Sequence, residues 1–519
     1  MALLHISLHP PSPLSFQRSS TTIPALIFSR HSSAKLHQRG IKLAAAALPS
    51  ESAIADFWRW LRERGTLTQP PPPVRPAVVP EGLGLVAERD MLRNEVVVEV
   101  PKKLWINTNT VAASEIGPVT LGLKPWVAIA LFLLREKAMG AASLWRPYLD
   151  ILPPETDSPI FCAGPRRSYP RCEVSASSLL INGVKTSTMV WLFKWNKDTS
   201  GTQLLNTTFG VKEYVQNEFT KVEDEVILPN KHLFQKTINS SDFLWAFGIL
   251  RSRAFSGLRG DKLVLIPLAD LINHNSSITS EDTCWEIKGK GLFSRELIFS
   301  LRTPASVNTG EQIYIQYDLQ KSNAELALDY GFIESNNKSR ELYTMTLEIS
   351  ESDPFYGDKL DIAESNGLGE TAYFDIVLDR PLPPLMLPYL RLVALGGTDA
   401  FLLESLFRNT VWGHLELPVS RANEEMICRV IQDSCTSALS YYQTTVEEDE
   451  KLMERGGLDP RSEIAIGIRS GEKKVLLQIE QVFGARESEL DTLEYYQERR
   501  LKDLGLSGEQ GEIIFWESK

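Results

Sequence analysis

The chain has 519 residues, of which 43% are hydrophobic, and its formal net charge is -11. A chain of this length and apolar content buries more than one hydrophobic core, so two or three domains are expected and a disordered or fibrous protein is excluded. The acidic balance argues against a nucleic-acid backbone as partner and is compatible with a basic protein segment as substrate.

The first 50 residues contain no Asp or Glu, five Lys and Arg residues and many Ser and Thr. This composition is typical of an organelle transit peptide, and a disordered basic tail is the alternative. Removing the segment would take the formal charge from -11 to -16. We therefore predict a transit peptide over 1–50 and an acidic mature protein.

The cysteines and the longest apolar run predict a reducing compartment and no membrane segment. The five cysteines are scattered and form no Cys-x-x-Cys pair, which is typical of a reducing compartment, so neither disulfides nor a zinc site is expected. The longest apolar run, 125–134, is about half of what a bilayer crossing requires. The sequence predicts a soluble, monomeric protein with no metal, no membrane segment and no nucleic-acid partner.

Residues 51–79 are predicted to form an N-terminal helix and a connector. Apolar residues recur at helical spacing from Ile54 to Leu61, and the pattern stops at Gly65. The proline-rich stretch that follows predicts an extended segment in the polyproline conformation.

The middle of the chain changes from strand patterns to helix patterns and back. Alternating β-branched residues over 85–106 predict two strands around a turn at Arg93 and Asn94. Helical patterns fill about 108–250, and strands return in LVLIPLADLI, CWEIKG, LIFSLRT and QIYIQY. The economical description is a β domain over 80–334 that carries a helical insert at about 108–250.

Two further stretches complete the organisation. From 358 to 519 the pattern is that of long helices, so the overall fold class is α+β with an α-helical C-terminal domain. Residues 162–201 show no sustained periodicity, and a structureless loop of that length inside a domain is improbable. We interpret them as a disordered insert or, preferably, a translated non-coding segment, and assign them no function.

A glycine-rich segment, PEGLGLVAERD at 80–90, formally contains a G-x-G-x-x-A pattern. A dinucleotide fingerprint requires a strand before it and a helix after it, whereas here a proline-rich connector precedes and a strand follows. The remaining interpretation is a turn whose glycines allow close approach of a ligand, with Glu81 as a hydrogen-bond acceptor. A plain turn is the alternative.

Polar groups gather at the ends of predicted strands and helices. Asp270, Asn273 and His274 follow an apolar run, and Arg253 ends an apolar helix, where it either binds a carboxylate or lies at a solvated edge. Tyr317 is in a strand segment, and a single tyrosine is more often core packing than chemistry. Several such groups in this order are a more specific signal.

In this order the segments resemble the SET-domain protein methyltransferases, and closely the plastid branch typified by the Rubisco large-subunit lysine methyltransferase. The resemblance covers about 52–161 and 202–519. The matching segments are EGLGLVA, ILRSRAF, LADLINH, GEQIYIQYD and SNAELALDYGFIE, followed by YLRLVALGGTDAFLLESLF and YYQERRLKDLGL. It implies a SET-type β fold with a helical insert and an α-helical substrate-binding domain at 358–519.

The resemblance also implies S-adenosylmethionine as methyl donor and assigns site residues. Tyr317 matches the catalytic tyrosine beside the transferred methyl. The implied donor-binding residues are Glu81, Gly82, Leu83, Arg253, Asn273, His274 and Tyr317. The implied substrate-binding residues are Arg253, Asp270, Trp285 and Tyr330. Trp285 stands where this branch carries a tyrosine, so the orientation of the amine and the number of methyl groups added are open.

The implied reaction is methylation of lysine in the chloroplast stroma, on the Rubisco large subunit, fructose-bisphosphate aldolase or both. A lysine amine is almost wholly protonated at pH 7, which costs the reaction about 4.6 kcal/mol, and a narrow apolar channel disfavours the charged form. No step requires a metal. The alternatives are a catalytically weakened protein-binding module and a protein-histidine methyltransferase.

Overall fold

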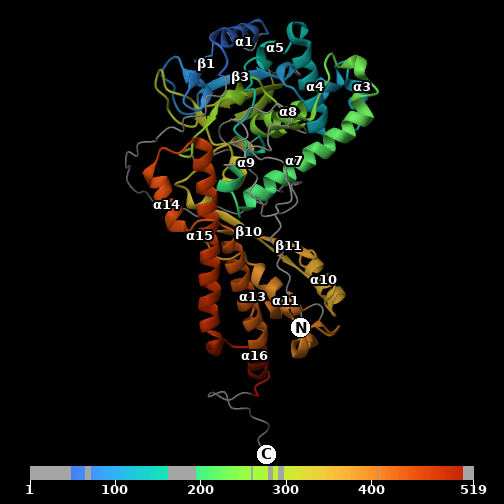
Figure 1. The fold of residues 1–519 in the computed structure, drawn as a ribbon, viewed down its shortest axis with the longest axis vertical. Helices are drawn as coiled ribbons and strands as arrows, with labels where there is room; N and C mark the ends of the chain where they lie inside the picture. Colours follow the sequence, from blue (N-terminus) through green and yellow to red (C-terminus); the bar gives the residue numbers. More distant parts are fainter. Residues whose placement is uncertain are drawn as a thin grey trace, which may run out of the picture.

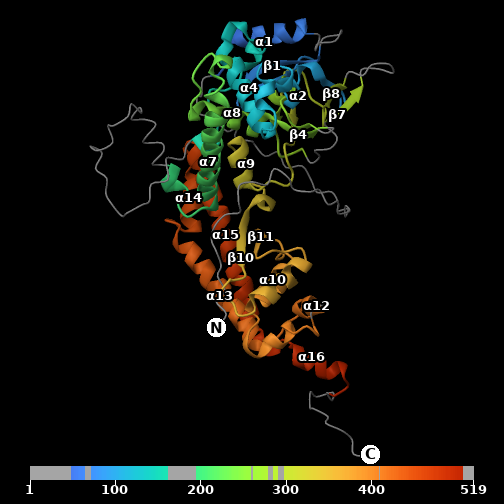
Figure 2. The same ribbon diagram turned by 90° about the vertical axis from the view of Figure 1, so that its right-hand side faces the viewer.

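The computed structural model describes residues 48–64, 72–161, 195–258, 261–278, 285–289, 297–407 and 410–506. The described chain has two parts (Figures 1 and 2): one holds the N-terminal helix, the small sheets and the helical insert, and an elongated part holds the C-terminal helices. The predicted transit peptide lies outside the described residues, apart from its last three.

Short strands form the first part, and they pair in small sheets. They are β1 (Val74–Val79), β2 (Gly82–Ala87), β3 (Val96–Pro101), β4 (Phe255–Leu258), β5 (Asp261–Val264), β6 (Asn273–His274), β7 (Trp285–Gly289), β8 (Leu297–Arg302) and β9 (Tyr314–Ile315). β1 pairs with β2, β4 with β5, and β8 lies between β3 and β7, all antiparallel. β6 and β9 pair in parallel, which brings two segments far apart in sequence together.

Helices cover these sheets. They are α1 (Glu51–Glu63), α2 (Thr108–Ala112), α3 (Gly117–Thr120), α4 (Pro125–Met139), α5 (Arg146–Leu149), α7 (Gln203–Val222), α8 (Ser240–Arg253) and α9 (Asn323–Tyr330), with a π-helical turn at Glu223–Ile227. α9 begins with a capping box of Ser322 and Glu325 and ends at Gly331, whose φ of 79° is the left-handed conformation that glycine favours.

The C-terminal part is α-helical except for one two-stranded sheet. Its elements are β10 (Leu342–Glu348), α10 (Tyr356–Ser365), β11 (Thr371–Val377), α11 (Met386–Ala394), α12 (Val411–Leu415), α13 (Arg421–Ser440), α14 (Val446–Arg455), α15 (Pro460–Ser488) and α16 (Tyr496–Asp503). β10 and β11 pair in antiparallel fashion along their whole length. The purely helical pattern expected after 358 therefore missed β11.

Helix α15 joins the two parts. Its first half packs in the core of the first part through Ile464 and Ile468, and its second half packs in the core of the C-terminal part through Val475 and Phe483. In Figure 1 this helix runs from the first part far down the C-terminal part. A Cβ at Gly467 would lie 2.3 Å from Ile333 Cδ1, so a larger residue there would push α15 away from the segment after α9.

The predicted polyproline connector is wrong over Val74–Val79, which forms strand β1. Pro76 lies opposite Leu85 in the pair with β2, and the other side of β2 is bridged to Gln312, so β1 is an edge strand. An edge strand tolerates a proline because its missing N–H is not needed for a second neighbour. The proline content predicted an extended connector, and composition alone does not identify the strand with which this segment pairs.

The predicted strand over LVLIPLADLI is also wrong beyond Val264, where β5 ends. Leu268 has a φ of 79°, and a 3-10 turn, η7 (Ala269–Leu271), follows. Most of the run is buried, with only Leu263 and Asp270 partly exposed, and an apolar run reports burial without fixing an extended backbone.

The irregular segment predicted over 162–201 is corrected at its end. Residues 162–194 lie outside the described residues, but Trp195 and Thr199 are buried in the first core region. Arg469 donates to the carbonyl oxygen of Asp198 at 3.0 Å, and Ser462 donates to the Asp198 carboxylate at 3.1 Å. Residues 195–201 are therefore an ordered contact of α15, which sequence periodicity could not reveal because the contact is long-range.

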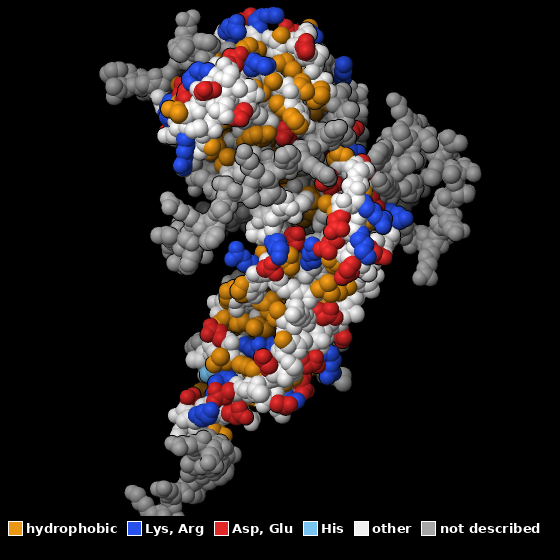
Figure 3. Space-filling model, turned by 90° about the vertical axis from the view of Figure 1, so that its left-hand side faces the viewer, with side chains coloured by type: hydrophobic (Ala, Val, Ile, Leu, Met, Phe, Trp, Pro, Cys, Tyr) orange, Lys and Arg blue, Asp and Glu red, His pale blue; other side chains and the backbone are white. Residues whose placement is uncertain are grey.

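Side chains of both charge signs alternate over the C-terminal part, with hydrophobic areas between them (Figure 3).

No single helix within the described ranges is long and apolar enough to cross a membrane. Only the pair of α11 and the 3-10 helix Gly397–Leu403, bent by 117°, meets that criterion jointly.

Candidate active site

The residues singled out in the sequence meet where β6 and β9 run side by side. β6 carries Asn273 and His274, and Tyr317 follows β9 by two residues. Arg253 comes from the last turn of α8 and Tyr330 from the last turn of α9. The parallel pairing thus brings together groups from four distant segments.

Tyr317 is held from two sides. Its hydroxyl donates to the carbonyl oxygen of Ile272 at 2.8 Å, and its backbone N–H donates to Nδ1 of His274 at 3.2 Å. Its ring centroid lies 4.7 Å from that of Tyr330. Burial raises the pKa of Tyr317 far above its ordinary value, although the positive charge of Arg253 opposes the shift. The phenol is therefore protonated at neutral pH and acts as a hydrogen-bond donor.

His274 has both ring nitrogens engaged. Nδ1 accepts from the Tyr317 N–H, so the proton of the neutral ring is on Nε2, which faces Oε1 of Glu334 at 2.8 Å. Phe332 stacks on the imidazole with centroids 4.9 Å apart. With neither nitrogen free, His274 is a structural group of the site and not an available base.

Glu334 is the buried acceptor behind His274. Burial alone would raise its pKa, but hydrogen bonds and ion pairing with His274, Arg340 and Asn337 outweigh burial and lower the pKa of Glu334 to about 2. Arg340 Nε lies 2.7 Å from Oε2, and the Arg340 side chain is only 3% exposed. On this side of the site, a buried carboxylate is thus paired with a buried guanidinium.

Asp270, on η7, is the second buried carboxylate. Its side chain is fully buried, and Oδ2 accepts from the hydroxyl of Tyr148 at 2.8 Å and lies 3.6 Å from Nη1 of Arg253. The same Arg253 nitrogen donates to the Asp270 carbonyl oxygen at 3.1 Å. Burial raises the pKa of Asp270, and Arg253 and Tyr148 only partly offset it. Among the described residues, Oδ1 has no hydrogen-bond partner.

A separate polar cluster lies at the turn between β1 and β2. Gln312 donates to Glu81 at 2.9 Å and to the Tyr314 hydroxyl at 2.7 Å, and it accepts from Asn273 at 2.6 Å. Burial and the neighbouring Glu81 carboxylate raise the pKa of Tyr314 to about 12. Glu81 and Asn273, distant in sequence, are thus connected through one glutamine.

The glycine turn gives this cluster its close approach. Gly82 has a φ of 114°, which strains any other residue. A Cβ at Gly84 would lie 2.5 Å from Oε1 of Gln312 and 2.9 Å from Nδ2 of Asn273. The carbonyl oxygen of Leu83 lies 3.5 Å from the same Asn273 nitrogen. The backbone of β2 therefore forms one wall beside the amide groups.

Trp285 is not brought into the tyrosine and aspartate contacts. It lies at the start of β7, is 37% exposed and stacks on Phe299 with centroids 5.8 Å apart. Phe299 in turn contacts Phe255, two residues after Arg253. Its proposed position near the substrate amine stays a prediction.

Sequence reasoning missed several residues of the site. Tyr148 lies in the helical insert with no pattern to mark it, and Gln312 and Glu334 were overlooked inside the matching segments GEQIYIQYD and SNAELALDYGFIE. Their polar types at the ends of those segments were the available signal. Tyr148 had none, because only the packing of α5 brings it to Asp270.

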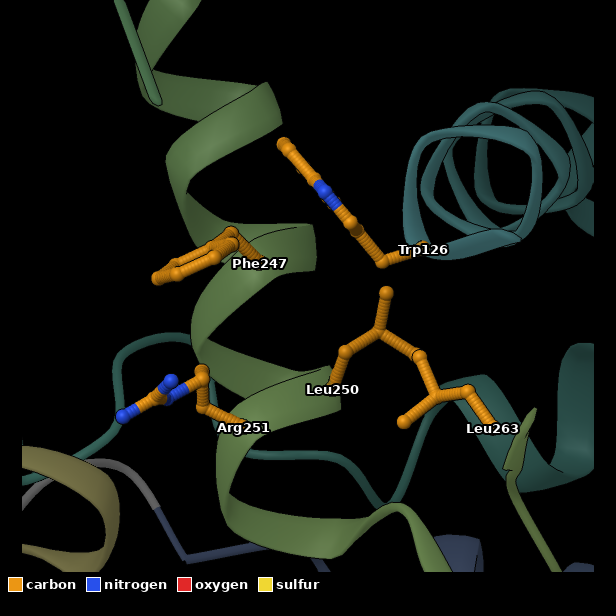
Figure 4. Close-up of a pocket in the computed structure, with 5 residues that line it drawn as sticks. All are labelled: Trp126, Phe247, Leu250, Arg251 and Leu263. Carbon is orange, nitrogen blue, oxygen red and sulfur yellow. The ribbon is translucent and has the colours of Figure 1, made fainter. Parts of the chain in front are cut away.

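A small, mainly apolar cavity between α4 and α8 is lined by Trp126, Phe247, Leu250, Arg251 and Leu263 (Figure 4). Its volume of about 10 Å³ corresponds to a single water molecule. Within the described ranges, no group of three or more His, Cys, Asp or Glu side chains is arranged to hold a metal ion.

Comparison with known proteins gives long matches. The chain is 60% identical over 505 residues to the chloroplastic [fructose-bisphosphate aldolase]-lysine N-methyltransferase of Arabidopsis thaliana, covering 97% of both chains. It is 60% identical over 467 residues to the chloroplastic ribulose-1,5 bisphosphate carboxylase/oxygenase large subunit N-methyltransferase of Nicotiana tabacum, covering 90% of this chain and 89% of the relative.

The fold and the C-terminal part match as well. A crystal structure of the SET domain of LSMT bound to lysine and AdoHcy superposes with a TM-score of 0.79 and 57% identity, covering 89% of this chain and 98% of that chain. A family profile described as "Rubisco LSMT substrate-binding" matches residues 350–476. The predicted α+β class, a SET-type fold followed by a helical domain, is confirmed.

Proposed function

The chain belongs to the family of the chloroplastic SET-domain protein-lysine methyltransferases, and on that premise we propose that it transfers methyl groups from S-adenosylmethionine to the ε-amine of lysine. The observation that carries the proposal is the 60% identity, over 97% of both chains, to a relative named for that activity. We further propose the chloroplast stroma as its location, since the relatives are named chloroplastic.

We propose as substrates the two proteins after which the relatives are named, fructose-bisphosphate aldolase and the Rubisco large subunit. The identity is 60% to both, so sequence similarity does not choose between them. The C-terminal domain, which matches the substrate-binding profile, would dock the protein substrate. We propose that the enzyme acts as a monomer.

The polar cluster at the glycine turn fits the methyl donor. The Glu81 carboxylate can accept from an ammonium group such as that of the donor's methionine part, and a Cβ at Gly82 would meet no atom within 4 Å, so the backbone beside Leu83 has room for a ligand. Asn273 and His274 form the wall on the β6 side, and Arg253 adds a guanidinium. The bound donor supplies an electrophilic methyl group on a sulfonium sulfur.

The aromatic groups fit the lysine side chain. Tyr330 and Tyr317 lie against each other, and a buried aromatic surface disfavours the ammonium form of a lysine that enters it. The ammonium would first give one proton to water; the neutral amine would then form a bond to the methyl carbon as the bond from that carbon to sulfur breaks, and S-adenosylhomocysteine would leave. Tyr317, protonated and fixed by Ile272 and His274, orients polar groups around the methyl and stabilises its partial positive charge.

The test is direct. The purified protein would be incubated with labelled S-adenosylmethionine and, separately, with aldolase and with Rubisco, and labelled peptides would be identified by mass spectrometry. We expect label on lysine of at least one of them. Label on histidine would replace lysine by histidine as the methylated residue, and no label on either protein would favour a binding module that has lost turnover.

A further inference from the structure

The phenol of Tyr148 is a buried group that the proposed reaction does not yet use. It lies in α5 of the helical insert, is completely buried, and its ring packs 6.2 Å from that of Phe57 in α1. Its hydroxyl donates to Asp270 across 122 residues of sequence. A buried hydroxyl 2.8 Å from a carboxylate oxygen makes a strong hydrogen bond that restrains the position of that carboxylate.

We propose that Tyr148 is a positioning residue of the lysine site, which holds the Asp270 carboxylate in the ionised form and orientation that fix Arg253. The inference rests on the proposed function. Nη1 of Arg253 lies 3.1 Å from the carbonyl oxygen of Asp270 and 3.6 Å from its carboxylate. The hydroxyl of Tyr148 lies closer to the Asp270 carboxylate than the guanidinium of Arg253 does. The guanidinium therefore stays hydrogen-bonded to the carbonyl oxygen of Asp270.

The electrostatics agree with this geometry. Asp270 is surrounded by Tyr148 from α5 and Arg253 from α8, and Tyr317 interacts electrostatically with Asp270, Arg253 and Glu81. Burial raises the pKa of Asp270, whereas the Tyr148 hydrogen bond lowers it. Without the hydroxyl, Asp270 would take up a proton or Arg253 would shift toward the carboxylate. Either change would move the positive charge that faces Tyr317.

Tyr148→Phe removes only the hydroxyl. We expect kcat to fall between about 10-fold and 100-fold, the range for losing a hydrogen bond to a charged group, with the KM for S-adenosylmethionine changed less than about twofold. The acid limb of kcat/KM against pH should move to higher pH, because the ionised Asp270 loses a donor. A purely structural role would lower the melting temperature without moving that limb.

The matched control is Tyr214→Phe, which removes a hydroxyl bonded to Lys124 and Trp126 in the same helical insert, away from the site. Its kcat and pH profile should equal those of the wild type. A wild-type pH profile and kcat for Tyr148→Phe would overturn the inference. Wild-type protein that labels no lysine would instead refute the proposed function.

A double-mutant cycle protects the test against a folding defect. Asp270→Asn keeps the volume of the side chain and removes its charge, so Tyr148→Phe should cost less than about twofold when added to Asp270→Asn. If the kcat losses of the two single variants multiply in full in the double variant, the inference is overturned. If Tyr148→Phe alone does not fold, Asp270→Asn by itself should show the loss of kcat, and unchanged kcat in that variant would also refute it.

Discussion

Two buried carboxyl groups near Tyr317, those of Asp270 and Glu334, have pKa values shifted in opposite directions. Glu334 has His274, Arg340 and Asn337 as partners, and together they lower its pKa to about 2 despite burial. Asp270 has one phenol and a more distant guanidinium, and burial prevails, so its pKa rises. The number and closeness of donors, and not burial itself, decides which acid is stabilised as an anion.

This difference suggests different tasks. Glu334 anchors the ring of His274 and so belongs to the framework of the proposed methyl-donor site. Burial disfavours the anionic form of Asp270 beside Arg253 and Tyr317, and a carboxyl group with a pKa perturbed in this way is a candidate for a functional role. The following variants test that distinction, beginning with the largest expected effect.

Glu334→Ala should lower the free energy of unfolding by about 3–5 kcal/mol, because it leaves the buried charge of Arg340 without its partner. Urea unfolding would measure it. As control, Glu286→Ala removes a solvent-exposed ion pair with Arg302 and should cost less than about 1 kcal/mol. Equal losses in the two variants would refute the framework role.

Tyr317→Phe should reduce kcat by about 100-fold to 1,000-fold while the fold is retained, because it removes a preorganised hydroxyl dipole whose oxygen stabilises the partial positive charge on the methyl group. Tyr389→Phe is the control for loss of a buried hydroxyl, since Tyr389 donates to the carbonyl oxygens of Gly369 and Glu370 in the C-terminal core. Its kcat should stay at the wild-type value. Single-turnover kinetics would separate methyl transfer from product release.

The acid dependence of stability should follow Glu334. Its folded pKa of about 2 is below the ordinary value of 4.5, so its contribution of about 3 kcal/mol is present above pH 4.5 and is lost as the pH falls toward 2. Urea midpoints of the wild type and Glu334→Gln between pH 6 and 3 would measure it. The difference between them should shrink toward acid; a constant difference would contradict the assignment.

Asp270→Asn should change the free energy of unfolding least among these variants, and in the opposite direction to Glu334→Ala. Because the pKa of Asp270 is raised in the folded state, stability falls as the pH rises through the ordinary value of 3.8 up to the raised one, and the charged form costs stability at neutral pH. The variant should therefore melt at the same or a higher temperature at pH 7 while kcat falls. A lower melting temperature would show that the Arg253 pair stabilises the fold.

Sequence patterns predicted the helices of the insert and the strands β7 and β8, whose periodicity reports local burial. They failed at Val74–Val79, which pairs with the neighbouring strand β2, and after Val264, where a turn at Leu268 with a φ of 79° follows the end of β5. They also failed at 195–201, which α15 holds in place. At 195–201 the deciding contact is remote in sequence, so no local window contains it. At Val74–Val79 the prolines obscured a local hairpin, and after Val264 an apolar run did not distinguish a strand from a buried turn.

The site divides in the same way. The sequence by itself determined the residue types and their order, and through them the resemblance that led to Glu81, His274 and Tyr317. Only the tertiary structure decided that Tyr148 contacts Asp270 and that Glu334 contacts His274. The reason is physical: a pKa and a hydrogen bond depend on which groups surround an atom, and here the parallel pairing of β6 with β9 and the packing of α5 determine those neighbours.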